Sequence, residues 1–315
     1  MDSEEEEDFG LKPGSVIESS HAKYTIDKLL GEGGFGAVYR VHDTNNPSME
    51  YALKVERKLE THRHLETSLN GTSRKVTFYK NYRPGQEGKI FFLVMQLVGK
   101  SLADLKALRP HKVFSMHTGL GASIQCLEAV EDLHKYGFIH RDLKPANYAT
   151  GLGVQIRCIY ILDFGIARRI LNDKGEIKTP RVSVGFKGTV KFAPIACHKR
   201  KELGPKDDCE SWFYLLLDLL IVTGLPWRKI SDKNEVMKVK EECRTNRDKL
   251  FYGIKCKEEF GKILEYIDSL HYEDRVDYSY IYELMKTSAV ICECKLTDPY
   301  DWEESMRKSD FQKSK

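Results

Sequence analysis

The strongest constraint on the fold is a change of hydrophobic pattern close to Gly99. Before this residue come short runs rich in Val, Ile, Tyr and Phe, separated by Gly, Pro and Asn, as expected for strands and turns. After it, apolar residues recur at helical spacing, as in Leu120, Ile124, Leu127 and Val130. The sequence therefore predicts an α+β chain, with a small β-rich N-terminal lobe and a larger helical C-terminal lobe.

The individual segments follow from the same periodicities. Strands are expected at 24–30, 37–41, 49–55, 76–82 and 89–97, a short helix at 59–69, and a buried helix at 212–222. The apolar window at 212–222 is too short to span a bilayer and contains Asp218. We expect an acidic, disordered tail at 1–20, one domain at 21–302 divided into lobes at 21–98 and 99–302, and a polar tail at 303–315.

Composition, charge and cysteine spacing limit the class of protein to which the chain can belong. A hydrophobic content of 41% and a charged content of 31% are ordinary for a globular protein. The net charge of +3 is small, so it does not favour a nucleic-acid partner. The acidic start lacks an apolar segment, and the eight cysteines form no CxxC pairs. We expect a cytoplasmic or nuclear protein with reduced thiols, no zinc site and no membrane partner.

A glycine-rich turn, GEGGFG at 31–36, joins the first two expected strands. Glycines at Gly31, Gly33 and Gly36 allow backbone N–H groups to approach an anion without clashes from Cβ atoms. A dinucleotide-binding turn has similar glycine spacing, but it would open a helix at Gly36, where this chain has the strand pattern AVYRV. Lys54, on the third expected strand, is a candidate contact to phosphate, although a strand lysine facing solvent is the alternative.

The motif with the most candidate catalytic residues is HRDLKPAN at 140–147, which is followed by DFG at 163–165. Asp142 is the candidate base that accepts a proton from a hydroxyl, and Lys144 can stabilise negative charge nearby. Asn147 and Asp163 offer the oxygen ligands that Mg²⁺ prefers. Each residue alone could simply form a local turn. In this order, after the glycine turn and Lys54, they indicate phosphoryl transfer from ATP to a hydroxyl.

These motifs resemble the eukaryotic protein kinase family over about 24–302, and more closely the casein kinase 1 superfamily near its tau-tubulin kinase branch. The segment FAPIACH at 192–198 replaces the usual Ala-Pro-Glu and is similar to that superfamily's Ser-Ile-Asn segment. GFKGTV, LPWRKI and PYDWE, at 185–190, 225–230 and 299–303, also look like the tau-tubulin branch. Lys144 together with Thr189 resembles the serine/threonine-specific pattern.

The resemblance implies roles for further residues. Met95 would guard the back of an adenine pocket, Gln96 and Val98 would bind adenine through their backbones, and Asp208 would brace the catalytic loop. The full set expected to contact ATP comprises Leu30, Gly31, Glu32, Gly33, Gly34, Phe35, Gly36, Ala37, Val38, Ala52, Lys54, Met95, Gln96 and Val98.

The resemblance leaves one element unsettled. Kinases usually pair the strand lysine with a glutamate in the next helix, and here Glu66 is the expected partner of Lys54, with Glu60 as the alternative. The family spacing falls nearer Ser68. This departure motivates a rival interpretation, a pseudokinase that acts as a binding or scaffold module. The intact Lys54 and Asp142 favour an active enzyme.

Four basic residues are candidates for binding the substrate. Lys187, Lys191, Arg228 and Lys229 would lie near the substrate groove if the resemblance holds. Charge-assisted contacts would then favour acidic or already phosphorylated protein substrates with Ser/Thr acceptors. A solvated basic face is the alternative.

Overall fold

The computed structural model describes residues 11–18, 22–33, 36–56, 78–84 and 89–303, and two compact units divide the chain between Val98 and Gly99. Each unit is described by itself below. The expected helix at 59–69, the acidic run near the start and the segment after 303 lie outside the described residues.

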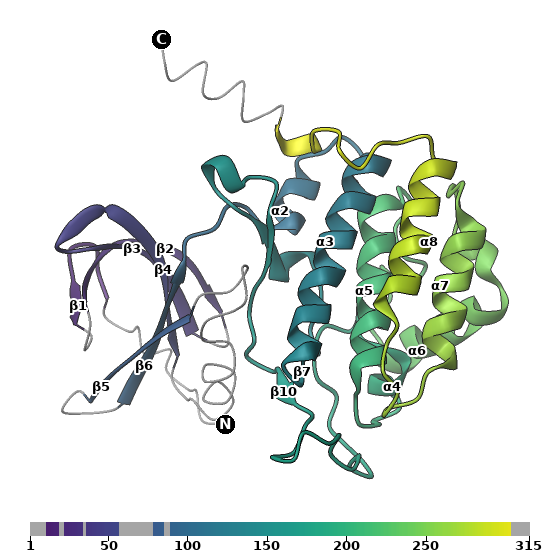
Figure 1. Cartoon of the computed structure of the whole chain (residues 1–315), viewed down its shortest axis with the longest axis horizontal. Helices are drawn as coiled ribbons and strands as arrows, with labels where there is room; N and C mark the ends of the chain where they lie inside the picture. Colours follow the sequence, from purple (N-terminus) through teal and green to yellow (C-terminus); the bar gives the residue numbers. More distant parts are fainter. Residues whose placement is uncertain (1–10, 19–21, 34–35, 57–77, 85–88, 304–315) are drawn as a thin grey trace. The chain divides into compact units, whose positions relative to one another are not determined.

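The N-terminal unit is an antiparallel sheet of six strands in the order β1-β2-β3-β4-β6-β5 (Figure 1). The strands are β1 (Val16–Glu18), β2 (Lys23–Gly33), β3 (Gly36–Asp43), β4 (Asn46–Glu56), β5 (Phe78–Pro84) and β6 (Lys89–Gln96). The five longer strands overlap the five strand segments expected from sequence, of which residues 76–77 lie outside the described ranges. The strand that begins at Gly36 also excludes the helix that a dinucleotide-binding turn would require.

Alternation along β3 separates the two faces of this sheet. Ala37, Tyr39 and Val41 are buried, and they pack in one hydrophobic cluster with Leu53 and Val55 of β4. The intervening residues of β3 are only partly buried. Because strand side chains alternate between faces, the residues between the core positions lie on the opposite face.

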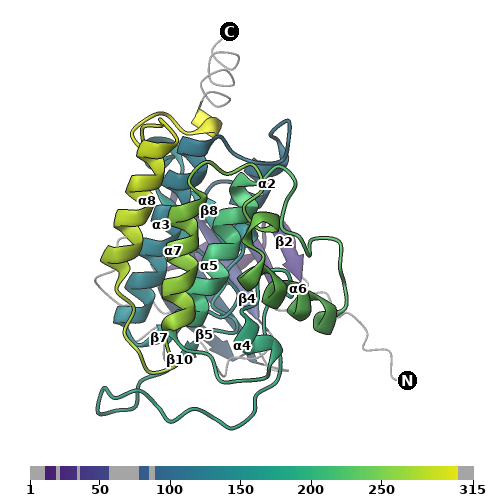
Figure 2. The same cartoon turned by 90° about the vertical axis from the view of Figure 1, so that its right-hand side faces the viewer.

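The C-terminal unit is mainly helical, with α3, α5, α7 and α8 side by side in both views (Figures 1 and 2). Its helices are α2 (Leu102–Ala107), α3 (Met116–Lys135), α4 (Ile195–His198), α5 (Pro205–Leu220), α6 (Lys233–Thr245), α7 (Lys257–Ser269) and α8 (Tyr278–Ile291). Short strands and 3-10 helices (η) lie between them: β7 (Phe138–Ile139), η1 (Pro145–Asn147), β8 (Tyr148–Thr150), η2 (Gly153–Gln155), β9 (Ile159–Ile161), β10 (Arg168–Arg169) and η3 (Arg247–Lys249).

The helix α5 lies at the centre of this unit. All but one of its residues are buried, and Trp212 donates its indole N–H to the Ser123 carbonyl of α3 at 2.8 Å. The sequence predicted that this helix would extend to 222, and that boundary was wrong. The helix ends at Leu220, and Val222 is 63% exposed, because the chain turns through Gly224 at φ 69°.

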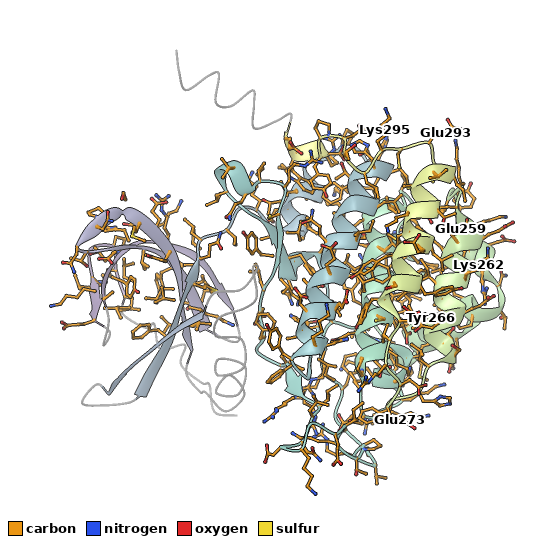
Figure 3. The ribbon with its side chains drawn as sticks, viewed as in Figure 1. Glu259, Lys262, Tyr266, Glu273, Glu293 and Lys295 are labelled. Atoms are coloured by element: carbon orange, nitrogen blue, oxygen red, sulfur yellow. The ribbon has the colours of Figure 1, made fainter. Side chains whose placement is uncertain are left out.

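The helices α7 and α8 form the outer part of the unit. Figure 3 shows Glu259, Lys262 and Tyr266 along α7. The Tyr266 hydroxyl accepts the backbone N–H of Asp277 at 2.6 Å, and the Asp277 side chain caps the start of α8. This contact fixes the connection between the two helices.

The described residues contain no helix long and apolar enough to cross a membrane. All eight cysteines are free thiols. Within the same ranges, no group of His, Cys, Asp and Glu side chains is arranged as a preformed metal site.

Candidate active site

The catalytic loop begins after the two-residue strand β7. Arg141 has a left-handed backbone, at φ 70°, which an arginine adopts only when its surroundings hold it there. The buried Asp208 carboxylate supplies that restraint, because it accepts the N–H of His140 at 2.6 Å and that of Arg141 at 2.9 Å. Asp208 therefore braces this loop from the first turn of α5.

Asp208 also binds a side chain of α3. His134 Nε2 lies 2.9 Å from the Asp208 carboxylate, and the Tyr278 hydroxyl of α8 contacts His134 Nδ1. Burial alone would raise the pKa of Asp208, but the hydrogen bond and charge of His134 and the nearby His140 outweigh it and lower that pKa. The carboxylate stays ionised, which lets it accept both loop N–H groups.

His140 has a structural role in the catalytic loop. Its side chain is fully buried and lies 5.4 Å, ring to ring, from Phe164. Burial lowers the pKa of His140, so the imidazole is neutral. Nε2 then donates to the Leu162 carbonyl at 3.0 Å, while Nδ1 accepts the Asp142 N–H at 3.3 Å. His140 thus ties the residue before Asp163 to Asp142.

The Asp142 carboxylate is held by several donors. Oδ2 accepts the Lys144 ammonium at 2.7 Å, and Oδ1 accepts both the backbone N–H of Thr189 at 2.8 Å and its hydroxyl at 2.7 Å. Lys144 also reaches the Thr189 hydroxyl at 3.0 Å. The Asp142 side chain is 11% exposed. This geometry fixes a carboxylate that still reaches solvent, as a base acting on a bound hydroxyl must.

The two proposed metal ligands lie at one end of the β8–β9 hairpin. Asn147 ends the short turn η1, and its carbonyl accepts the Leu162 N–H at 2.8 Å, which places the next residue, Asp163, beside it. The Asn147 amide nitrogen donates to the Asp142 carbonyl at 2.8 Å. The Asn147 side-chain oxygen is then the atom that can bind a cation, and with the Asp163 carboxylate it fits the ligand chemistry of Mg²⁺.

Asp163 has an unusual backbone, with φ 60°. Its side-chain Oδ1 accepts the N–H of Gly165 at 3.3 Å. A non-glycine residue in the left-handed region is uncommon, and such strain is typical of functional positions. The sequence motif located this residue, but it gave no sign of the backbone conformation.

Gly188 brings residues 163–194, here called the activation segment, against the catalytic loop. It has φ 92°, and a Cβ atom at this position would lie 2.4 Å from the Arg141 carbonyl and 3.4 Å from the Asp142 carboxylate. Only glycine permits this approach. Thr189, the next residue, reaches Asp142 because of it. No local sequence signal relates two residues this far apart in the chain.

The predicted ATP contacts of the N-terminal unit can be traced within its own sheet. Lys54 pairs in register with Val38, on the face opposite the core, and Ala52 pairs with Met95 of β6. Ala37, by contrast, packs in the core, so its side chain does not share the face of Val38 and Lys54.

Of the remaining residues predicted to contact ATP, the structure describes some and not others. Leu30, Gly31 and Glu32 are exposed on β2, while Gln96 and Val98 are partly buried at and after the end of β6. Gly34 and Phe35, and both proposed partners of Lys54, Glu66 and Glu60, lie outside the described residues. Those assignments stay predictions.

The four basic residues of the predicted substrate groove differ in their exposure and in their partners. Lys191 makes an ion pair at 2.5 Å with Asp218, a carboxylate of α5 that also binds Lys106. Lys187, Arg228 and Lys229 are exposed. Lys191 lies close to the loop that carries Arg228, because the Trp227 indole donates to the Lys191 carbonyl at 2.8 Å. The sequence did not anticipate the Asp218 partner.

The chain has a six-stranded N-terminal sheet and a helical C-terminal unit, in which a loop carries Asp142 and Asn147 and the adjacent hairpin carries Asp163. These features define the two-lobed protein kinase fold. The protein kinase domain model matches residues 24–286, and the chain belongs to this family. Membership implies use of ATP and a divalent metal ion.

Individual relatives give the same result. A probable serine/threonine-protein kinase of Dictyostelium discoideum is 31% identical over 94% of this chain, which spans 59% of that protein. The serine/threonine-protein kinase spe-6 of Caenorhabditis elegans is 31% identical over 97% of this chain and 83% of its own length. A protein of the same worm that is provisionally named a casein kinase I is 30% identical over 94% and 87%.

Proposed function

We propose that the chain is an active serine/threonine kinase that transfers the γ-phosphoryl group of ATP to a hydroxyl of a protein substrate. The observation that carries the proposal is the geometry of Asp142. Its carboxylate is oriented by the Lys144 ammonium and by both donors of Thr189, yet it remains reachable from solvent. A pseudokinase would have no need to hold these residues in this arrangement.

The reaction assigns one role to each residue. The substrate oxygen forms a bond to the γ-phosphorus as the β–γ bridging bond breaks, ADP leaves, and Asp142 accepts the hydroxyl proton. Lys144, 2.7 Å from Asp142, supplies positive charge beside the reacting oxygens. Asn147 and Asp163 would hold Mg²⁺, which neutralises phosphate charge when bound. Lys54 would contact the ATP phosphates, with Glu66 as its partner.

The finer classification is also a proposal. We infer a casein kinase 1-like enzyme near the tau-tubulin branch, with 21–302 as the kinase domain and a cytoplasmic or nuclear location. The segment 192–198, which lacks Ala-Pro-Glu, supports it, as does the relative named a casein kinase I. In this segment the Ile195 N–H donates to the buried Glu210 of α5 at 3.0 Å.

The substrate preference rests on exposed basic groups. Lys187, Arg228 and Lys229 are exposed, and Lys191 is 34% exposed despite its ion pair with Asp218. These groups would favour acidic or already phosphorylated peptides. Charge reversal by Arg228→Glu and Lys229→Glu should then weaken phosphorylation of acidic peptides and spare neutral ones. An equal effect on both peptide classes contradicts the preference, without affecting the assignment of kinase activity.

Transfer of labelled phosphate from Mg²⁺-ATP to Ser/Thr peptides tests the proposed activity. Wild type should label the peptide, and Asp163→Ala should lower labelling at least about 100-fold, because one of the two metal ligands is lost. Asp173→Ala is the matched control, since Asp173 is fully exposed on the activation segment. If wild type binds ATP but labels no peptide above the Asp163→Ala level, the pseudokinase interpretation replaces this one.

A further inference from the structure

One buried cation has no part in the proposed chemistry. Lys240, on α6, has no exposed surface, and its ammonium makes no ion pair among the residues that the structure describes. An uncompensated buried ammonium is costly, so its donors must be satisfied in another way. Val236 and Cys243 share the buried face of the helix with it.

The three N–H groups of Lys240 meet three acceptors from one segment. Nζ lies 2.9 Å from the Val190 carbonyl, 2.6 Å from the Ala193 carbonyl and 3.2 Å from His198 Nε2. An ammonium has three donors and no acceptor, so the set is complete. His198 can accept because burial, together with the charge of Lys240, lowers its pKa to about 4 and keeps the ring neutral.

The segment bound by Lys240 is the turn that follows Thr189. Within this turn, the Thr189 carbonyl accepts the N–H groups of Phe192 and Ala193, each at 2.9 Å. The Lys191 carbonyl accepts the Trp227 indole. Lys240 supplies the donors for the carbonyls of residues 190 and 193. The inward carbonyls of the turn are thereby satisfied, and the turn begins at the residue that binds Asp142.

Two aromatic rings also face the ammonium. Lys240 Nζ lies 4.9 Å from the centre of the Tyr214 ring and 5.2 Å from that of Trp227, which is a favourable cation–π arrangement. Burial lowers the pKa of Lys240 to about 7, while Glu210 and Cys197 act in the opposite direction and Arg244 lowers it further. Together with His198, these are the charged and titratable groups that face the ammonium.

We propose that Lys240 is a positioning residue for the peptide substrate: it holds the turn 189–193 in the conformation that presents the acceptor hydroxyl to Asp142. The proposal rests on the proposed kinase function. It also predicts a local structural effect that can be measured whether or not the chain phosphorylates peptides. Lys240 touches neither of the proposed metal ligands, so ATP binding should not depend on it.

Kinetics of Lys240→Met separate positioning from general destabilisation. The substitution keeps a long unbranched side chain and removes all three donors. We expect the KM for peptide to rise at least about tenfold, with the KM for ATP and the slow hydrolysis of ATP within about twofold of wild type. Lys238→Met is the matched control, because Lys238 is exposed on the same helix. Loss of all activities in proportion, with an unchanged peptide KM, contradicts the proposal.

Hydrogen exchange gives a readout that needs no kinase activity. In Lys240→Met, protection of the backbone N–H groups of Thr189, Phe192, Ala193 and Cys197 should fall at least about tenfold, while α5 keeps its protection. Lys240→Gln, which retains two N–H donors, should lie between Lys240→Met and wild type. Unchanged protection of this segment overturns the proposal, whatever the kinetics show.

The pH dependence of the wild-type protein provides a third test, which remains available if the variants fail to fold. Because the folded pKa of Lys240 lies below its unfolded value of 10.5, the cost of burying the charge is present below pH 7 and is relieved as the pH rises toward 10.5. Above pH 7 the neutral amine has only two donors. Peptide KM should therefore rise between pH 6.5 and 8.5 while global stability does not fall. A parallel loss of stability over that range contradicts the positioning role.

Discussion

Gly188→Ala perturbs the contact between the activation segment and the catalytic loop. The new Cβ would lie 2.4 Å from the Arg141 carbonyl, whereas ordinary contacts begin near 3.4 Å, so the segment must move by about 1 Å. The Thr189 N–H, now 2.8 Å from Asp142, would pass beyond hydrogen-bond distance.

Two energetic effects add in this variant. A left-handed alanine costs about 1–2 kcal/mol, and a lost hydrogen bond to a charged group costs about 1.5–3 kcal/mol. We therefore expect Gly188→Ala to lower the free energy of unfolding by about 2.5–5 kcal/mol. Since a misplacement of about 1 Å can lower catalysis about 100-fold, kcat/KM for peptide should fall by about that factor.

Two other glycines of the same segment serve as matched controls, measured by urea unfolding and peptide phosphorylation. Gly175 has φ 78° and open space at its Cβ position, so Gly175→Ala isolates the backbone strain, about 1–2 kcal/mol, and should leave kcat/KM unchanged. Gly185→Ala has neither strain nor clash and should be neutral or slightly stabilising. If Gly188→Ala matched Gly175→Ala in both stability and activity, the reasoning from close approach would be refuted.

Two further predictions concern stability. Glu210→Gln removes one of the two carboxylates that pair with the buried Arg244 at 2.8 Å, the other being Asp268. The loss should destabilise the protein by about 1.5–3 kcal/mol in urea unfolding. Glu265→Gln breaks an exposed pair and should cost under about 1 kcal/mol, and similar losses in both variants would contradict this. Because the folded pKa of His198, about 4, lies below its unfolded value of 6.5, its contribution is complete above pH 6.5 and is lost as the pH falls toward 4, by about 1–2 kcal/mol after allowance for partial exposure. His198→Gln should flatten that part of the stability–pH curve, and an unchanged slope would show that other groups cause it.

The fold could be predicted from sequence to a large extent, because period and turn residues are local signals. Alternation along β3 and the 3.6-residue period of α3 both gave the correct element type. The end of α5 could not be predicted as well, since the apolar pattern continues through Ile221 although the backbone leaves the helix there.

The sequence predicted which residues form the site better than it predicted the contacts between them. The motif order located Asp142, Asn147 and Asp163, which the structure brings onto one loop and the adjacent hairpin. The pairing of Lys191 with Asp218 depends on tertiary packing that no local pattern records. The burial of Lys240 had a weak signal, because it lies four residues after the buried Val236 on one helical face.

The central claim is that Asp142 accepts the proton of the substrate hydroxyl. A rapid-quench measurement of a single turnover, with Mg²⁺-ATP and a Ser/Thr peptide, tests it most directly on wild type, Asp142→Asn and the exposed control Asp173→Asn. We expect the rate of phosphoryl transfer to fall about 100- to 10,000-fold in Asp142→Asn, with ATP affinity retained, and to be unchanged in Asp173→Asn. A transfer rate in Asp142→Asn within about threefold of wild type would contradict the role of Asp142 as the base.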